Sequence, residues 1–213
     1  ENISDTFIEK TLQNSDSVIN LDMKSMLFLW KKYLKNLELP NIIFQITLKT
    51  ILKNKLDYDE KNNCFLNITS THLPLVADFI KFWDTTIFED PDSLGFEADE
   101  LVCLFKRYLG KSSIVIKDDM LIEWIMHYYP HINIKNSKYI HHINNKSWDK
   151  YADVLLSIGS FKKRTHSAKS LDDFYKYYCK FAKEQKYIFV MSKYYFDLIA
   201  PKYLDIDNDG MII

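Results

Sequence analysis

Residues 27–68 carry four consecutive segments that predict one order of elements: LFLWKKYL (27–34), LPNIIF (39–44), ITLKTILKNKL (46–56) and LDYDEKNNCFLNI (56–68). Apolar side chains recur three and four positions apart in the first and third segments, which predicts amphipathic helices over 22–36 and 45–55. Proline at position 40 ends the first helix because it biases its predecessor towards extended geometry. LPNIIF predicts a short strand, and the polar run 59–63 between two β-prone runs predicts a hairpin.

The same order of elements is expected a second time further along the chain. A helix from Ala98 precedes a strand over 113–116 and then a helix that starts at Asp118 or Asp119. Proline at position 130 stops that helix, and the pattern over 132–143 predicts strand, turn and strand. Lys106-Arg107 stands in the first helix of this copy where Lys31-Lys32 stood in the first copy.

A third copy closes the sequence. Ser170 can cap a helix, residues 187–190 predict a strand, Ser192 can cap a second helix, and Asn208-Asp209-Gly210 predicts a tight turn between two β-prone runs. The copies are spaced by roughly 72–75 residues, and self-similarity at a long fixed period indicates repeated modules.

Helix, strand, helix and hairpin is the order of a winged-helix domain, which normally has a further helix in front. We therefore expect a mainly α fold with short β-hairpins, built of tandem winged-helix-like repeats. Helices over 74–88 and 147–158 would be the front helices of the second and third copies. The expected parts are an N-terminal arm (1–21), unit 1 with its following helix (22–88), unit 2 with its following helix (98–158) and unit 3 (170–213).

Composition limits the class of protein. Only four glycines and five prolines in 213 residues favour helices with short connections. The three cysteines are far apart without CxxC spacing, which is typical of free thiols in a reducing compartment. The sequence shows neither a secretory signal nor an apolar run that would cross a membrane. We therefore expect an intracellular protein in the cytoplasm or nucleus, or in the host-cell cytoplasm if the source is viral, with no membrane partner.

Positive charge is concentrated although the formal net charge is -1. The stretch 31–55 contains six lysines and only one acid, Glu38. A second basic run covers 162–169. In helix-turn-helix relatives the second helix enters the major groove while neighbouring groups contact phosphates. The expected nucleic-acid-binding residues are Lys49, Thr50, Lys53, Lys55, Lys31, Lys32, Lys162, Lys163, Arg164 and Lys193.

Catalytic and metal-binding motifs are weak by comparison. The sequence contains neither GxSxG nor the glycine-rich phosphate motifs, so no catalytic residue and no cofactor are expected. Asp205, Asp207 and Asp209 fit the first half of a calcium loop whose acidic twelfth position is missing, so a plain hairpin turn is the competing interpretation. His127 and His131 are four residues apart, but Pro130 interrupts the helix that would align them as zinc ligands.

Three segments resemble the C-terminal regions of viral D5-type (phage P4-like) primase-helicases: LPLVADFIKFWDTTI (73–87), EADELVCLFKRYL (97–109) and SLDDFYKYYCKFAKEQKYIFVMSKYYFDLI (170–199). In such families an aromatic-rich helix leads through V-S-K to a recognition helix. The matching positions are Tyr175, Tyr178, Phe181, Val190, Ser192, Lys193 and Phe196, with Met191 interposed. The primase and ATPase motifs of the family are absent. The resemblance implies an accessory part of a replication enzyme that engages DNA or contacts other subunits.

The sequence thus favours a non-catalytic nucleic-acid-binding accessory module of a viral or mobile-element replication protein, with DNA a better candidate than RNA. Other subunits of a replication complex are further expected partners. A protein-interaction scaffold of tandem winged helices is the alternative, since the second copy carries the acids Asp118, Asp119 and Glu123 on its second helix. A calcium-responsive C-terminus is a third possibility.

Overall fold

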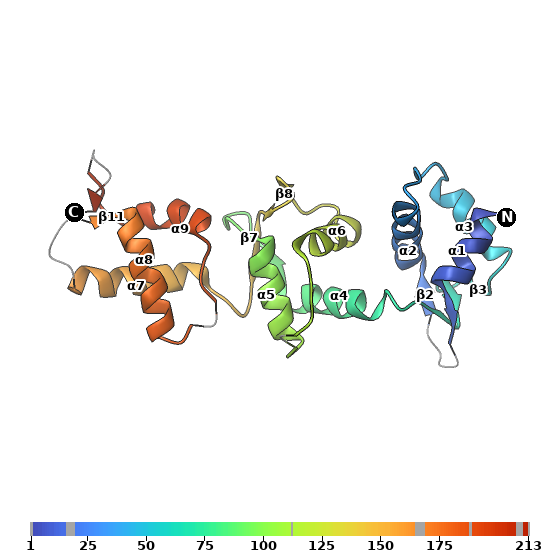
Figure 1. The fold of residues 1–213 in the computed structure, drawn as a ribbon, viewed down its shortest axis with the longest axis horizontal. Coiled ribbons are helices and arrows are strands. Elements are labelled where there is room, and N and C mark those ends of the chain that lie inside the picture. The colour runs from blue at the N-terminus through green and yellow to red at the C-terminus, as the bar shows by residue number, and fades with distance from the viewer. Residues whose placement is uncertain are drawn as a thin grey trace. The chain divides into compact units, whose positions relative to one another are not determined.

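The computed structural model describes residues 2–15, 20–111, 113–164, 169–187, 189–207 and 211–212. The chain forms two compact units, Glu1–Ile80 and Lys81–Ile213, which are coloured from blue to green and from green to red in Figure 1. The division falls within the helix α4 (Pro74–Thr86). Helices predominate among the described residues, and every sheet is small and antiparallel.

Unit 1 begins with a short helix whose first turn is capped by Asn2, a residue that accepts a hydrogen bond from the Ser4 N–H. Asp22 caps the second helix in the same way by accepting from the Ser25 N–H. The elements before α4 are α1 (Ile3–Thr11), β1 (Gln13–Asn14), β2 (Asn20–Asp22), α2 (Met23–Asn36), α3 (Gln45–Lys53), β3 (Tyr58–Asp59), β4 (Cys64–Leu66) and β5 (Ile68–Thr69).

The strands of unit 1 hold its helices over a small aromatic core. The three-stranded sheet has the order β2-β4-β3, with Phe65 opposite both Leu21 and Tyr58, and β1 pairs with β5. On the helical side, the ring of Phe7 lies 5.1 Å from that of Trp30 and 5.4 Å from that of Tyr33. The helix α1 is therefore tied to α2 by its one large buried ring.

Unit 2 repeats this order of elements. After α4 come β6 (Ile87–Glu89), β7 (Phe96–Glu97), α5 (Ala98–Tyr108), α6 (Asp118–Tyr128), β8 (Ile134–Lys135), β9 (Tyr139–Ile140) and β10 (Ile143–Asn145). The remaining described elements are α7 (Lys150–Arg164), β11 (Lys169–Ser170), α8 (Leu171–Glu184), α9 (Lys193–Ile199), the short 3-10 helix η1 (Ala200–Lys202) and β12 (Met211–Ile212).

Strand pairing and core rings in unit 2 match those of unit 1. The order β7-β9-β8 reproduces β2-β4-β3, and β6 pairs with β10 as β1 pairs with β5. Phe82 lies 5.3 Å from Phe105 and 5.4 Å from Tyr108, ring to ring. In the last part of the unit β11 pairs with β12, and Ile206 bridges to Ile212.

The prediction of a strand between the two helices of each copy is wrong for the residues that the structure describes. Residues 39–44, 113–116 and the described part of 187–190 lie in no strand. The strand that joins each hairpin comes instead just before the first helix of the pair, as β2, β7 and β11 do. A β-prone stretch forms a strand only with a neighbour to hydrogen-bond. In unit 1 the side chains of Ile42 and Phe44 are 80% and 82% exposed.

Two further predictions concern the end of the chain. The helix predicted over 147–158 continues through Gly159 to Arg164, so the basic residues 162–164 belong to α7 and not to a linker. The predicted turn Asn208-Asp209-Gly210 lies outside the described residues.

The structure divides the chain into two compact units. The division into four parts that the sequence suggested stays a prediction. None of the helices in the described ranges is long and apolar enough to cross a membrane.

Candidate nucleic-acid interface

Two of the predicted lysines meet at one aromatic ring in unit 1. The ammonium groups of Lys49 and Lys53 lie 5.0 Å and 4.8 Å from the ring centroid of Tyr58, which stands on β3. Both lysines lie on α3, four residues apart, so one helical face carries both. The aromatic ring is attractive to cations, and it places the two charges beside the hairpin.

The hairpin turn holds the same two side chains. Lys49 donates a hydrogen bond to Oδ1 of Asn63 at 2.8 Å, and Lys53 forms an ion pair with Glu60. The side chain of Glu60 is 69% exposed. A salt bridge at such an exposed position contributes roughly 0–1 kcal/mol, so an incoming phosphate could replace this carboxylate at little cost.

The outer edge of α3 is partly polar. Gln45 and Thr50 are exposed, and the Thr50 hydroxyl donates to the carbonyl of Ile46 at 3.0 Å. The Thr50 oxygen can still accept a hydrogen bond, but its proton is used within the helix. Ile46 is itself 80% exposed, so an apolar side chain shares this edge.

The other predicted cations of unit 1 have separate surroundings. Lys55 forms an ion pair with Asp5 and contacts the Ser4 hydroxyl, so it binds α1 instead of extending the hairpin face. Lys31 is exposed, and Lys32 lies 3.5 Å from the Nδ1 atom of His72. Burial, followed by the charge of Lys32, lowers the pKa of His72, which favours the neutral imidazole.

In unit 2 the predicted cations lie in two places, the last turn of α7 and a pair of carboxylates beside the start of α9. Lys162 and Lys163 are exposed in the last turn of α7, where Arg164 also lies. Lys193 lies 2.6 Å from Asp197 and 2.9 Å from Asp172. Its charge is thus compensated by two carboxylates, which makes it a poor phosphate ligand.

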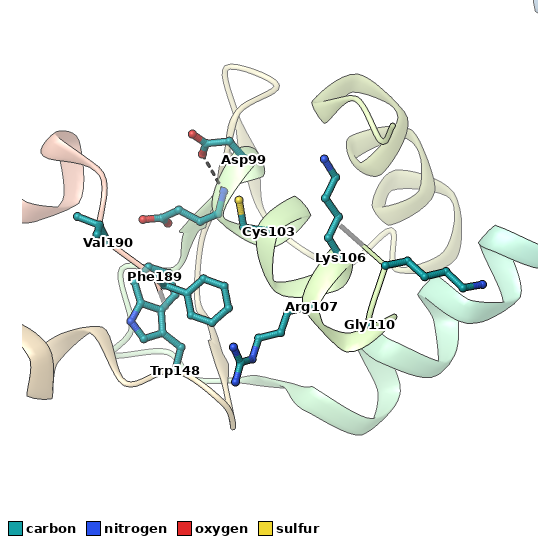
Figure 2. Close-up of a pocket in the computed structure, with 10 residues that line it drawn as sticks. Asp99, Cys103, Lys106, Arg107, Gly110, Trp148, Phe189 and Val190 are labelled. Carbon is teal, nitrogen blue, oxygen red and sulfur yellow. Dashed lines mark hydrogen bonds between the residues drawn. The ribbon is translucent and has the colours of Figure 1, made fainter. Parts of the chain in front are cut away.

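A cleft of about 540 Å³ in unit 2 was not predicted (Figure 2). Lys106, Arg107 and Lys111 line one part of it, and the Arg107 guanidinium lies 5.8 Å from the ring centroid of Phe189. The Lys106-Arg107 pair was the available signal, since it occupies the position of Lys31-Lys32. Burial, with the nearby Asp99, raises the pKa of the Cys103 thiol in this cleft. That thiol is therefore protonated near neutral pH and is a weak nucleophile.

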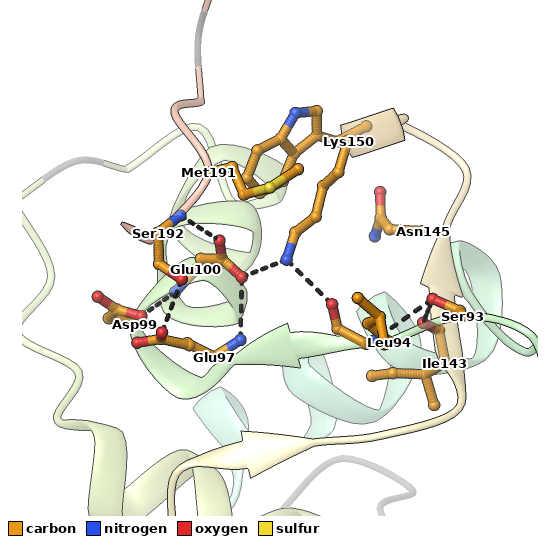
Figure 3. Close-up of polar contacts among 12 residues, drawn as sticks. Ser93, Leu94, Glu97, Asp99, Glu100, Ile143, Asn145, Lys150, Met191 and Ser192 are labelled. Carbon is orange, nitrogen blue, oxygen red and sulfur yellow. Dashed lines mark hydrogen bonds and ion pairs between the residues drawn. The ribbon is translucent and has the colours of Figure 1, made fainter. Parts of the chain in front are cut away.

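A buried polar network lies next to this cleft (Figure 3). The ammonium of Lys150 lies 2.5 Å from Oε2 of Glu100 and donates to the Gly95 carbonyl at 3.0 Å. The Ser192 N–H donates to Oε1 of Glu100 at 3.0 Å, and the Ser192 hydroxyl donates to Glu97 at 2.6 Å. The network joins the starts of α5, α7 and α9. Lys150 compensates the charge of Glu100, whereas Glu97 forms its ion pair at 2.9 Å with Lys138, whose side chain is 50% exposed. Its role is to hold these elements together.

The metal sites considered from sequence find no support in the described part of the chain. The described residues contain no group of three or more His, Cys, Asp or Glu side chains that could hold a metal ion. Asp205 and Asp207 are described, whereas Asp209 lies outside the described residues. His131 lies 3.3 Å from a carboxylate oxygen of Glu89.

Comparison of the chain with protein-family models, with curated proteins and with solved structures finds no match in any of the three.

Proposed function

We propose that the chain is a non-catalytic nucleic-acid-binding module, with duplex DNA as its ligand, and that it is built of tandem winged-helix-like units. The order β2-β4-β3, with a helix before β2 and two helices before the hairpin, supports this interpretation. In a winged helix, the first strand also pairs with the last. The matching order β7-β9-β8 supports a second unit of the same kind.

The observation that carries the proposal is the convergence of Lys49 and Lys53 on Tyr58. In helix-turn-helix relatives the second helix lies in the major groove, and neighbouring groups bind the phosphates beside it. The helix α3 would be that helix, and its two lysines stand where the helix meets the hairpin. Gln45 and Thr50 on the exposed edge would face base edges or phosphates.

The resemblance of three segments to the C-terminal regions of D5-type primase-helicases supports a role in a replication protein. Under this proposal the chain acts inside the cell as an accessory part of a viral or mobile-element replication protein and contacts other subunits. The exposed pair Lys162 and Lys163 would add phosphate contacts from unit 2. Lys55 and Lys193, which are occupied by carboxylates, would add little.

The test is binding of labelled duplex and single-stranded DNA at low salt by the chain and by Lys49→Glu/Lys53→Glu. The double variant is expected to lose at least about tenfold in affinity, because two phosphate contacts become repulsive. Lys176→Glu/Lys180→Glu is a matched control, since it makes the same charge change at the same spacing on an exposed face of α8. Equal affinity of both double variants would refute the proposed interface.

One observation favours a protein-interaction scaffold as a second candidate. Ile42, Phe44 and Ile46 are each at least 80% exposed at the start of α3. A contiguous exposed apolar patch is typical of a protein contact. If the triple serine variant of these residues keeps DNA affinity but loses a co-purifying partner, the scaffold function is supported. Negligible DNA binding by the unmodified chain at low salt would make it the better proposal.

A further inference from the structure

In unit 2 an extended apolar segment sits on the start of α5. Met191 is completely buried and Phe189 is 8% exposed. The following residue, Ser192, is the N-cap of α9, and its N–H and hydroxyl donate to the carboxylates of Glu100 and Glu97 at 3.0 Å and 2.6 Å. The segment therefore combines buried apolar side chains with a polar anchor at a helix start.

Unit 1 has a counterpart of this acceptor surface. The strand β2 leads directly into α2 as β7 leads into α5, and both strands lie at the same place in their sheets. Asp22 is the N-cap residue of α2, the position that Glu97 has on α5. Ser25 holds the third helical position, which Glu100 holds on α5.

A cavity of about 300 Å³ lies at the counterpart positions. Its apolar walls include Leu21, Leu73, Val76 and Ile80, and Asp22 stands among the lining residues. One Asp22 oxygen accepts from the Ser25 N–H at 2.6 Å, and a carboxylate has further lone pairs to offer. The volume is at the lower end of the range for ligand pockets, roughly 300–1,000 Å³.

The chemistry of the lining selects the kind of occupant. No Lys, Arg or His is found among the described residues that line the cavity, so a phosphate-bearing ligand would have no counter-charge. An apolar side chain would bury against Leu21 and Val76, and a hydroxyl or N–H donor would meet Asp22. The segment 189–192 of unit 2 has both features: Met191 is completely buried, and the donor Ser192 bonds to the carboxylates at the start of α5.

We propose that this cavity of unit 1 is an acceptor site for an extended apolar segment of a partner protein, with a serine or threonine at the helix start that follows it. The inference rests on the correspondence of the two units and does not depend on nucleic-acid binding. The apolar side chain in the Met191 position fills the cavity, and the hydroxyl in the Ser192 position bonds to Asp22.

The probe is a fluorescein-labelled peptide with the sequence of residues 189–196, FVMSKYYF, titrated with the full chain and followed by fluorescence anisotropy. A second peptide replaces its methionine by aspartate. Ala77→Trp fills the cavity from an exposed position of α4, whereas Asp78→Trp places the same ring one position away on an exposed residue that does not line it. Thermal unfolding checks that both variants fold.

Saturable binding of one peptide per chain is expected. Affinity should fall at least about tenfold in Ala77→Trp or with the aspartate peptide, and stay unchanged in Asp78→Trp. Absence of saturable binding, or equal affinity in the two tryptophan variants, would overturn the proposal. A concentration-dependent dimer that only Ala77→Trp abolishes, without peptide binding, would overturn it too, because the occupant would then be a second copy of the chain.

Discussion

The ammonium group of Lys150 lies 2.5 Å from a carboxylate oxygen of Glu100, and each side chain is only 5% exposed. The same ammonium lies 4.2 Å from the ring centroids of both Phe96 and Tyr195. Burial lowers the pKa of Lys150 while the charge of Glu100 favours the ammonium form. Two charges buried this deeply are tolerated because each has a partner in hydrogen-bonding distance.

Removing one member of this pair is expected to destabilise unit 2 strongly. Lys150→Met leaves the Glu100 carboxylate without its counter-charge, which should lower the free energy of unfolding by about 3–5 kcal/mol. Lys150→Met combined with Glu100→Met should cost less than the sum of the two single variants, because the pair is lost only once. Urea unfolding measures Lys150→Met, Glu100→Met and the double variant. Lys176→Met, at a 77% exposed side chain, is the control with an effect of less than about 1 kcal/mol. A double variant as unstable as the sum of the single ones would contradict the pairing.

Any side chain at Gly95 is expected to destabilise unit 2. Its φ is +90°, and a Cβ added there would stand 1.8 Å from the Ile140 carbonyl oxygen of the neighbouring strand. Gly95→Ala should therefore lower the stability of unit 2 by more than about 3 kcal/mol. Gly159→Ala, in the middle of α7 with open space around it, should instead raise it by about 0.5–1 kcal/mol. Similar melting temperatures for the two variants would contradict the close approach of Gly95 to the Ile140 carbonyl.

The helices and hairpins could be predicted from sequence because each has a local signal. The spacing of apolar residues predicted the bounds of α2, α3, α5 and α6 to within a few residues. Turn residues predicted the β3–β4 and β8–β9 hairpins. The strands β2 and β7 could not be predicted, because two or three residues show no period and are extended only through their pairing with β4 and β9.

The candidate site was predictable only in part. Lysine spacing on α3 indicated the Lys49 and Lys53 face, but sequence could not show that Glu60 pairs with Lys53 or that Asp5 pairs with Lys55. These partners come from other elements, and their position depends on tertiary packing. The burial of Lys150 was missed for the same reason.

The aromatic clusters around Phe7 and Phe82 are expected to contribute similarly to the stability of their units. Phe7 in unit 1 and Phe82 in unit 2 are almost completely buried, and each contacts two rings on the next helix of its unit. Phe7→Ala and Phe82→Ala should each cost about 3–5 kcal/mol. Limited proteolysis with mass spectrometry can assign each loss to its own unit. A loss below about 1 kcal/mol at either position would argue against the correspondence of the two units.

Acid is expected to weaken unit 2 through His141. Its Nε2 atom is buried and has no hydrogen-bond partner among the described residues. Burial, followed by the charges of Lys135 and His142, lowers the pKa of His141 in the folded state. The unfolded chain therefore binds the proton more readily, so stability is present above about pH 6.5 and falls as the pH drops below it. His141→Gln should flatten this fall in urea midpoints between pH 7.5 and 5.5. An unchanged pH profile in His141→Gln would contradict this account.

The salt dependence of duplex DNA binding tests most directly whether Lys49 and Lys53 contact phosphates. Each phosphate neutralised on B-DNA contributes about 0.9 to the slope of log affinity against log salt. Lys49→Gln/Lys53→Gln should therefore reduce the magnitude of that slope by about two relative to the unmodified chain, with Lys176→Gln/Lys180→Gln leaving it unchanged. An identical slope for the chain and for Lys49→Gln/Lys53→Gln would contradict the claim.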